Sequence, residues 1–424
     1  MTVPRLLGAF APGTAPAAAN PLLVLLPSLG TTSALWDGVV ARLRADPRTA
    51  GLRILRVDLP GHGASPVATG PVTIGDLARA VLAVVDEAGG GAFHVAGVSL
   101  GGVIALELAV ANPDRVRSLV LSCSGARIGT PDGWDERAAS VRASGTASLV
   151  TGSASRWFAP GFLEREGGGP GARTLTTLVD VDDESYARCA EALAGFDRTG
   201  DLDGLGMPTL AISAEHDPVT TPASMQGLAD AIPGGRHVSI DGASHLAVLE
   251  DPATAAGLIA GHIADAERVA AASVAHDRGM RVRRQVLGDP HVDAAVAATT
   301  PETAPFQDFI TRYAWGEVWA RPGLTRRERS IATLASLVTG GHEAEIRMHV
   351  RAALRNGLTR AEIAEVVLHT ALYAGLPAAN SALGIAREVF AGLDAETEAD
   401  SGAAQGPAPA SDSPDDPTSE EHHG

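Results

Sequence analysis

The 424-residue sequence contains no lysine, so all 33 of its basic residues are arginine. A Schiff-base lysine, a pyridoxal-phosphate site and a P-loop lysine are therefore excluded, because each needs an amine that this chain does not have. Cysteine is also scarce: Cys123 and Cys189 are the only two, and their spacing does not pair them. This scarcity predicts a reduced protein, with the cytoplasm as its location.

Long apolar runs and excess positive charge are missing as well. The longest apolar run near the start, Leu22 to Leu26, is too short to span a bilayer, and no basic segment with a cleavage site precedes it. We therefore expect neither a membrane partner nor an export signal. The net charge of −17 argues against a nucleic-acid partner, which would need a basic face.

The length fits two domains and a tail better than one core. Residues 1–265 are expected to form the first domain, because short apolar runs there alternate with helical periods. The predicted buried strands are Pro21–Leu26, Arg53–Val57, Ala92–Ala96, Ser118–Ser122, Pro208–Ser213 and His237–Ile240. The predicted helices include Ile74–Glu87, Gly102–Ala111, Pro222–Ala231 and Pro252–Ala264. The pattern indicates a doubly wound α/β sheet, with a helical cap at about 126–200 where the strand rhythm is lost.

A different pattern follows an Ala-rich linker at 266–276. Residues 277–393 show helical periods without strand alternation, and capping boxes begin at Thr325 and Thr359. The pair Asn356-Gly357 is a typical helix stop. We therefore predict an all-α second domain. The segment 394–424, rich in acidic residues, proline and serine, is expected to be a disordered tail.

The first domain contains a candidate nucleophile, Ser99. The segment Gly97–Gly101 reads Gly-Val-Ser-Leu-Gly, and it lies between a predicted strand and a predicted helix. A nucleophile elbow needs this context, because glycines two positions either side of the serine let the strand and helix approach closely. The motif alone would be weak in a chain with 48 glycines. Its placement makes a serine α/β-hydrolase the favoured interpretation.

The partners of Ser99 follow in the order that this fold requires, an acid and then a histidine. Asp217 and His245 each come just after a predicted strand, so both should lie at the carboxyl edge of the sheet with Ser99. His245 would accept the serine proton, and Asp217 would orient the imidazole. The backbone N–H groups of Leu29 and Leu100 are expected to form the oxyanion hole.

Other residues offer alternatives to this triad. His216 could replace its neighbour in the site, although a side chain one position along the chain points elsewhere. Glu215 and Asp241 are expected on turns or at the surface, and His94 within the core. His62 is expected to be a turn element and not a base.

Four segments carry a specific resemblance across residues 20 to 262: Pro27–Thr32, Arg56–Gly63, Gly97–Gly102 and Gly125–Trp134. They resemble the 3-oxoadipate enol-lactone hydrolases, α/β-hydrolases of aromatic degradation. The resemblance implies that the cap contributes Arg127 and Trp134 to the pocket, where arginine would bind the free carboxylate of a lactone substrate. A surface ion pair is the alternative role for Arg127.

In the second domain, the pattern of polar residues leaves the chemistry open. His342, Glu345 and His349 are spaced i, i+3 and i+7, which places them on one face of a predicted helix. Such a set could bind a metal, transfer protons or simply be a solvated face. The spacing is not His-Glu-x-x-His, so a zincin is not favoured.

A second resemblance runs through nearly all of residues 277–393, in Met280–Asp293, Phe306–Gly316, Arg321–Ser330 and His349–Gly357. These segments resemble the 4-carboxymuconolactone decarboxylases, which share a helical fold with the alkylhydroperoxidase D-like family. No cysteine follows Cys189, so the thiol peroxidase chemistry of that family is excluded here. The resemblance implies an all-α decarboxylase domain without cofactor or metal.

The expected decarboxylase residues are His342, Glu345 and His349, whose individual roles the spacing does not assign. The reaction would stabilise a dienolate and protonate carbon. An arginine should hold the carboxylate that stays, and the candidates are Arg312, Arg321 and Arg347, each with a surface ion pair as its alternative role.

Together the two resemblances imply a bifunctional enzyme of the protocatechuate branch of the 3-oxoadipate pathway. It would decarboxylate 4-carboxymuconolactone to the enol-lactone and hydrolyse that to 3-oxoadipate, with small lactones as its ligands. The alternative is another serine ester hydrolase, or a haloperoxidase-type enzyme, fused to a helical oligomerisation module. Relatives of the helical fold form rings, so a homo-oligomer assembled through the second domain is expected.

Overall fold

The computed structural model describes residues 3–12, 20–167 and 169–403. It divides into two compact units, Met1–Val269 and Ala270–Gly424. The boundary lies inside helix α11 (Pro252–Leu287), so the predicted linker at 266–276 is helical and the chain has no break there. Alanine is the strongest helix former, which explains why this Ala-rich segment continues the helix.

The first unit is built on a seven-stranded sheet with the order β1-β3-β2-β4-β5-β6-β7. Its strands are β1 (Gly8–Phe10), β2 (Leu22–Leu26), β3 (Arg53–Val57), β4 (Phe93–Val98), β5 (Val116–Ser122), β6 (Thr209–Ala214) and β7 (Arg236–Ile240). All neighbouring strands are parallel except β1, which pairs antiparallel with β3 at the edge. The six predicted strands are confirmed. The edge strand β1 was not predicted, because three exposed residues give no alternation to detect.

Helices cover the sheet and bury its strands, which explains why β2, β4 and β6 are apolar without alternation. The helices of this layer are α1 (Asp37–Ala45), α2 (Ile74–Glu87), α3 (Leu100–Ala111), α9 (Pro222–Asp230), α10 (Ala247–Glu250) and the first part of α11. Short 3-10 turns lie at η1 (Ser33–Trp36), η2 (Pro113–Arg115), η3 (Thr146–Leu149) and η4 (Thr199–Gly204). Helix α3 is buried through Ala109 and packs between β4, β5 and α2.

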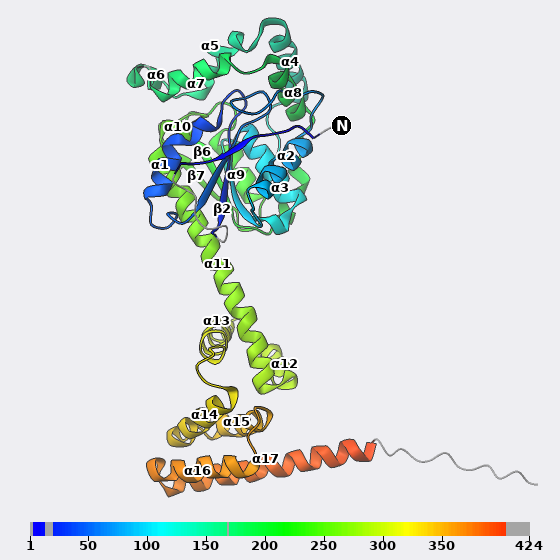
Figure 1. The fold of residues 1–424 in the computed structure, drawn as a ribbon, viewed down its shortest axis with the longest axis vertical. Helices are drawn as coiled ribbons and strands as arrows, with labels where there is room; N and C mark the ends of the chain where they lie inside the picture. Colours follow the sequence, from blue (N-terminus) through cyan, green and yellow to red (C-terminus); the bar gives the residue numbers. More distant parts are fainter. Residues whose placement is uncertain (1–2, 13–19, 168, 404–424) are drawn as a thin grey trace, which may run out of the picture. The chain divides into compact units, whose positions relative to one another are not determined.

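The cap is a helical insertion between β5 and β6, as predicted, and Figure 1 shows it on one side of the sheet. Its helices are α4 (Pro131–Ser144), α5 (Val150–Trp157), α6 (Phe162–Glu166), α7 (Pro170–Val179) and α8 (Asp183–Ala194). Arg142 on α4 bonds both Glu184 and Glu191 on α8, which fixes these two helices against each other. This matters for function because α4 and α5 carry side chains into the pocket described below.

The described residues of the second unit form helices joined by short turns, without a strand, as predicted. It contains the rest of α11, then α12 (Asp289–Ala297), α13 (Ala304–Ile310), a π-helix η5 (Thr311–Trp319), α14 (Arg326–Gly340), α15 (Glu343–Arg355), α16 (Arg360–Ala374) and α17 (Leu376–Ala403). Both predicted capping boxes are present, at Thr325 and Thr359, and α15 ends at the predicted stop before Asn356. One apolar core joins α14 to α17, and a smaller one joins α11, α12, η5 and α15.

The expectation of disorder from residue 394 is wrong for its first part. Helix α17 continues to Ala403, because Asp394 and Glu396 pair with Arg360 and Arg351 of neighbouring helices. These acidic residues therefore stabilise a helix and do not belong to a solvated tail. The remainder of the predicted tail, 404–424, lies outside the described residues.

Candidate active sites

The structure places Ser99 on a strained turn between β4 and α3. Its φ angle is 52°, in the left-handed region that side chains rarely adopt. The flanking glycines are needed, because a Cβ on Gly97 would lie 2.1 Å from the carbonyl oxygen of Gly101. A Cβ on Gly101 would lie 2.4 Å from the carbonyl oxygen of Leu26. The turn is therefore a nucleophile elbow in its packing as well as in its sequence.

The predicted acid and base lie together. His245 Nδ1 is 2.9 Å from Asp217 Oδ2, and both side chains are almost fully buried. Burial works to raise the pKa of Asp217, but hydrogen bonds from His245, Thr220 and Val219 hold that pKa below its ordinary value. An ionised carboxylate only accepts hydrogen bonds, so the proton of this pair lies on Nδ1 and Nε2 is free to act as a base.

The alternative residues take structural roles. His216 is about half exposed and lies beside Glu215. Glu215 accepts the backbone N–H of Gly242, which makes it a turn residue as expected. His94 is buried between Ser118 and Glu267. Of the two histidine side chains, that of His245 hydrogen-bonds Asp217 and that of His216 does not, so the structure favours His245 as the partner of the acid.

His62 does more than form a turn. Its Nε2 accepts the N–H of Gly30 at 3.0 Å, and its Nδ1 lies 2.7 Å from the carbonyl oxygen of Pro60. Burial lowers the pKa of His62 to about 4, so the ring is neutral at pH 7 and can accept one bond while donating the other. His62 therefore anchors Gly30, and the residue just before it, Leu29, is the expected oxyanion donor. No local pattern in the sequence indicates this contact, which joins residues 32 positions apart.

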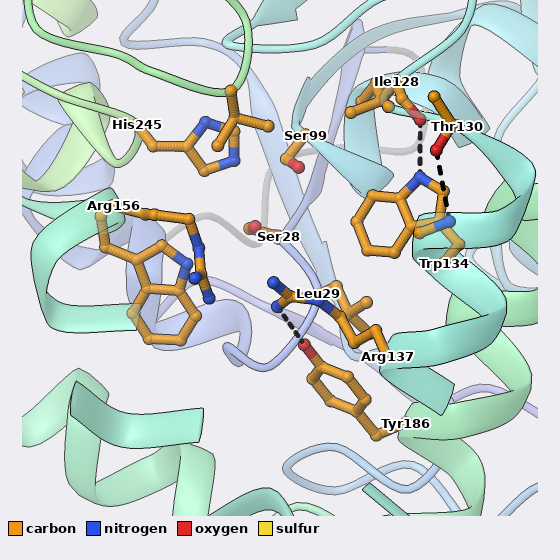
Figure 2. Close-up of a pocket in the computed structure, with 14 residues that line it drawn as sticks. Ser28, Leu29, Ser99, Ile128, Thr130, Trp134, Arg137, Arg156, Tyr186 and His245 are labelled. Atoms are coloured by element: carbon orange, nitrogen blue, oxygen red, sulfur yellow. Dashed lines mark hydrogen bonds between the residues drawn. The ribbon is translucent and has the colours of Figure 1, made fainter. Parts of the chain in front are cut away.

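A pocket of about 310 Å³ opens above Ser99 and His245. Leu29 and Trp134 line it, and Figure 2 shows Trp134 on one side and His245 on the other. The Trp134 indole N–H donates to the carbonyl oxygen of Ile128 at 2.6 Å, which fixes the ring at the wall. Leu100 follows Ser99 as the first residue of α3, where backbone N–H groups lack helical partners. Leu100 thus adjoins the nucleophile and Leu29 lines the same pocket, and their role as oxyanion donors stays a prediction.

The arginines of the pocket are not the predicted one. Arg127 is about half exposed and pairs with Asp197 at 3.6 Å, so it does not line the pocket. Arg137 and Arg156 line it instead, from α4 and α5. The prediction was wrong because Arg127 lies before the cap helices, where its side chain turns toward the segment after α8.

Neither pocket arginine forms an ion pair with any carboxylate in the described part of the chain. Arg137 lies over the Trp134 ring and donates to the Tyr186 hydroxyl at 3.3 Å (Figure 2). Arg156 is half-buried, and burial together with the nearby charge of Arg137 lowers its pKa. Two unneutralised guanidinium groups beside the nucleophile favour an anionic ligand.

Glu250 is a further residue that the sequence did not indicate. Its carboxylate accepts the backbone N–H of Ser244 at 2.5 Å and that of Ala159 at 2.8 Å. Burial raises the pKa of Glu250. Because Ser244 precedes His245 and Ala159 belongs to the cap, this carboxylate ties the position of the base to the position of the pocket wall.

In the helical unit, the three predicted residues are only partly together. Helix α15 begins after His342, whose ψ angle of 75° is not helical, and a Cβ on Gly340 would lie 2.6 Å from its ring. His342 therefore folds back toward α14, and the helical face continues with Glu345 and His349. Glu345 is exposed, whereas His349 is half-buried and stacks on Trp319 with centroids 6.4 Å apart. Burial lowers the pKa of His349 to about 4.

Two of the arginines expected to hold a carboxylate are already paired. Arg312 bonds Asp308 at 2.6 Å, and Arg347 bonds Glu388 at 2.6 Å. Arg321 is exposed, and its carbonyl oxygen accepts a hydrogen bond from Arg329. For Arg312 and Arg347 the structure thus agrees with the surface ion pair that was the alternative role.

Membrane-spanning helices and metal-binding clusters are both absent from the described residues. None of the helices in residues 3–12, 20–167 and 169–403 has the combined length and hydrophobicity that a bilayer span requires. Over the same residues, no three His, Cys, Asp or Glu side chains form a group able to hold a metal ion.

Comparison with known proteins gives each unit a family. Residues 23–258 match the alpha/beta hydrolase family, and residues 304–388 match the carboxymuconolactone decarboxylase family. The chain is 34% identical over 232 residues to 3-oxoadipate enol-lactonase 1 of Acinetobacter baylyi, covering 55% of this chain and 84% of the relative. It is 49% identical over 118 residues to 4-carboxymuconolactone decarboxylase of the same organism, covering 28% of this chain and 88% of the relative.

A solved structure supports the hydrolase assignment. The enol-lactonase from Burkholderia xenovorans LB400 is 33% identical, with a TM-score of 0.57, and the match covers 61% of this chain and 96% of that one. The chain therefore belongs to the alpha/beta hydrolase family through residues 23–258 and to the carboxymuconolactone decarboxylase family through residues 304–388.

Proposed function

We propose that this chain is a bifunctional enzyme that decarboxylates 4-carboxymuconolactone and hydrolyses the resulting 3-oxoadipate enol-lactone to 3-oxoadipate. The observation that carries the proposal is the presence of both families in one chain, each aligned over most of a relative that bears one of these two activities. The two reactions are consecutive, because loss of CO2 from the first lactone gives the substrate of the second.

The hydrolase site suits the second reaction. Ser99 Oγ attacks the lactone carbonyl while His245 Nε2 takes its proton, and the N–H groups of Leu29 and Leu100 hold the tetrahedral oxyanion. The ring C–O bond then breaks, and His245 returns the proton to the leaving enol oxygen. Water hydrolyses the acyl-enzyme by the same route in reverse, and the released enol tautomerises to the 3-oxo acid. Asp217 keeps the imidazole in the required tautomer throughout.

Recognition of the free carboxylate is assigned to Arg137 and Arg156. Both line the pocket of Ser99 and neither is neutralised by an acidic side chain in the described residues. A planar guanidinium can bind a carboxylate through two N–H groups, which fixes its direction as well as its charge. Trp134 and Trp157 supply apolar walls for the lactone ring.

The experiment that tests the proposed function follows both steps in one reaction. Purified protein is supplied with 4-carboxymuconolactone, and the products are identified by NMR and by CO2 release. We expect one CO2 and one 3-oxoadipate for each lactone consumed. Unchanged 4-carboxymuconolactone would refute the decarboxylase half, and hydrolysis of simple aryl esters in preference to the enol-lactone would favour the alternative ester hydrolase.

Replacement of a pocket arginine by glutamine should weaken binding of the enol-lactone. For Arg137→Gln and Arg156→Gln we expect kcat/KM to fall roughly 10- to 100-fold, mostly through KM, because a hydrogen bond to a charged group contributes about 1.5–3 kcal/mol. Steady-state hydrolysis of the enol-lactone measures this. The same change at Arg127, the residue predicted from sequence, should have little effect. Equal losses for a neutral lactone without a carboxylate would contradict the assignment.

We further propose that the chain self-associates through its second unit and works in the cytoplasm. Leu368, Leu372, Tyr373 and Leu376 at the α16–α17 turn are each more than 60% exposed, and such apolar patches commonly mark protein contacts. The two cysteines are free and buried, as suits a reducing compartment.

A charge introduced into this apolar patch should dissociate the oligomer into single chains. Leu372→Glu is expected to lower the molecular mass measured by light scattering to that of one chain, because a carboxylate cannot be buried there without a partner. Hydrolysis of the enol-lactone serves as the folding control. A wild-type mass of a single chain would refute the proposal directly.

A further inference from the structure

Arg283 in the second unit is a buried cation without an anion. Only 5% of the residue is exposed, and among residues 270–398, whose burial the structure describes, no other ionisable side chain is buried. Its Nη1 donates to Gln307 Oε1 at 3.2 Å and to Thr311 Oγ1 at 3.3 Å, while its buried Nε has no hydrogen-bond partner. No carboxylate in that range forms an ion pair with it. An unneutralised buried charge is costly, so it indicates that an anion binds there.

Two glycines bring Arg283 to this position. A Cβ on Gly279 would lie 1.9 Å from the Thr311 carbonyl oxygen, and one on Gly316 would lie 2.4 Å from the Ala275 carbonyl oxygen. Helix α11 and the π-helix η5 can therefore lie in backbone contact at this point. Arg283 stands one helical turn after Gly279. Its guanidinium therefore reaches Thr311 on the facing helix.

Two histidines adjoin the same small core, His349 half-buried and His291 exposed. Val292, next to His291 on α12, packs in one cluster with Val286 of α11, and Met348 and Trp319 adjoin that cluster. Trp319 stacks on His349. Burial and the charge of Arg283 lower the pKa of His291. Burial and the charge of His291 likewise lower the pKa of His349, and the charge of Glu345 opposes this shift. His291, beside Val292, and His349, stacked on Trp319, thus adjoin the core that includes Val286, three residues after Arg283 on α11.

We propose that Arg283 is the anion-binding residue of the decarboxylase centre, where it holds the carboxylate that the lactone keeps, and that His291 and His349 complete this centre. The proposal rests on the proposed decarboxylase function. It replaces the arginines expected from the sequence, of which Arg312 and Arg347 already have carboxylate partners. The ligand class is a small lactone bearing two carboxylates.

The chemistry explains why the retained carboxylate is the better partner. In the reaction the C–COO⁻ bond breaks, CO2 leaves, and the electron pair passes through the ring double bond to the lactone carbonyl oxygen. A proton then adds to the carbon next to that carbonyl. A cation on the departing carboxylate would be less well bound as its charge is lost, which would slow the reaction. A cation on the retained carboxylate anchors the substrate without this penalty.

The test uses the full chain carrying Ser99→Ala, so that the enol-lactone is not consumed. The enol-lactone keeps only the retained carboxylate, so its inhibition of decarboxylation reports the contact with Arg283. We expect Arg283→Gln to raise both the KM for 4-carboxymuconolactone and the inhibition constant of the enol-lactone roughly 10- to 100-fold. An unchanged inhibition constant would overturn the proposal, as would a fall in kcat alone.

Two further variants separate this role from a structural one. Arg278→Gln removes an arginine from the same helix, where it pairs with Glu317 at the surface, and should leave both constants unchanged. Arg283→Lys keeps the charge and should recover part of the lost binding, whereas Lys and Gln variants of equal affinity would refute a role for the charge. Helix content and enol-lactone hydrolysis, measured with Ser99 intact, report the folding of each variant. A wild type without decarboxylation would refute the function itself, independently of these variants.

Discussion

Ser99→Ala is expected to convert this enzyme into a producer of enol-lactone. Supplied with 4-carboxymuconolactone, the variant should release CO2 at the wild-type rate and accumulate the enol-lactone. Its hydrolysis should fall by roughly four orders of magnitude or more, because loss of the nucleophile leaves only oxyanion stabilisation and binding. The strained turn, with φ of 52° at Ser99, directs the Ser99 side chain toward the lactone, and alanine has no hydroxyl to replace it. Product analysis by NMR over time measures both steps.

Ser155→Ala is the matched control, because Ser155 is exposed on cap helix α5. It should give 3-oxoadipate at the wild-type rate. Rapid formation of 3-oxoadipate by purified Ser99→Ala, beyond the spontaneous hydrolysis measured without protein, would show that another group performs the attack. A simultaneous loss of decarboxylation would show that the two units do not act independently.

Asp217→Asn should have the next largest effect, a fall of about four orders of magnitude in kcat for hydrolysis. All four partners of the carboxylate are donors: Val219 N–H at 2.8 Å, Thr220 N–H at 3.2 Å, Thr220 Oγ1–H at 2.6 Å and His245 Nδ1–H at 2.9 Å. An amide NH2 would therefore face a donor in either orientation. His245 can accept a hydrogen bond from the amide only by moving its proton to Nε2, which removes the base.

The comparison that isolates this effect is Asp241→Asn. Asp241 is an exposed aspartate on the turn before His245, so it undergoes the same change of charge outside the hydrogen-bonded pair. The Asp241→Asn variant should hydrolyse the enol-lactone at close to the wild-type rate. Decarboxylation should be unaffected in both variants. A modest loss for Asp217→Asn, of less than tenfold, would mean that the imidazole keeps its tautomer without the carboxylate.

Much of the first unit follows from local sequence. Helix α2 has the predicted bounds Ile74–Glu87, because a capping box at Thr73 and a continuous apolar face define it without help from the rest of the chain. The elbow at Ser99 is equally local, since strand, glycines and helix are adjacent. The order of Ser99, Asp217 and His245 is a property of the topology, which the alternation of strands and helices already predicts.

Sequence alone determined the two-family organisation and the positions of most strands and helices, and it predicted the nucleophile with its acid and base. Tertiary structure decided which of these candidate arginines are neutralised: Arg127, Arg312 and Arg347 form ion pairs, whereas Arg137, Arg156 and Arg283 form none in the described residues. It also decided that His62 anchors the oxyanion loop and that His342 lies outside α15. The physical reason is that a backbone motif is set by neighbours in the chain. The burial and neutralisation of a charge instead depend on groups that are distant in sequence and meet only when the helices pack.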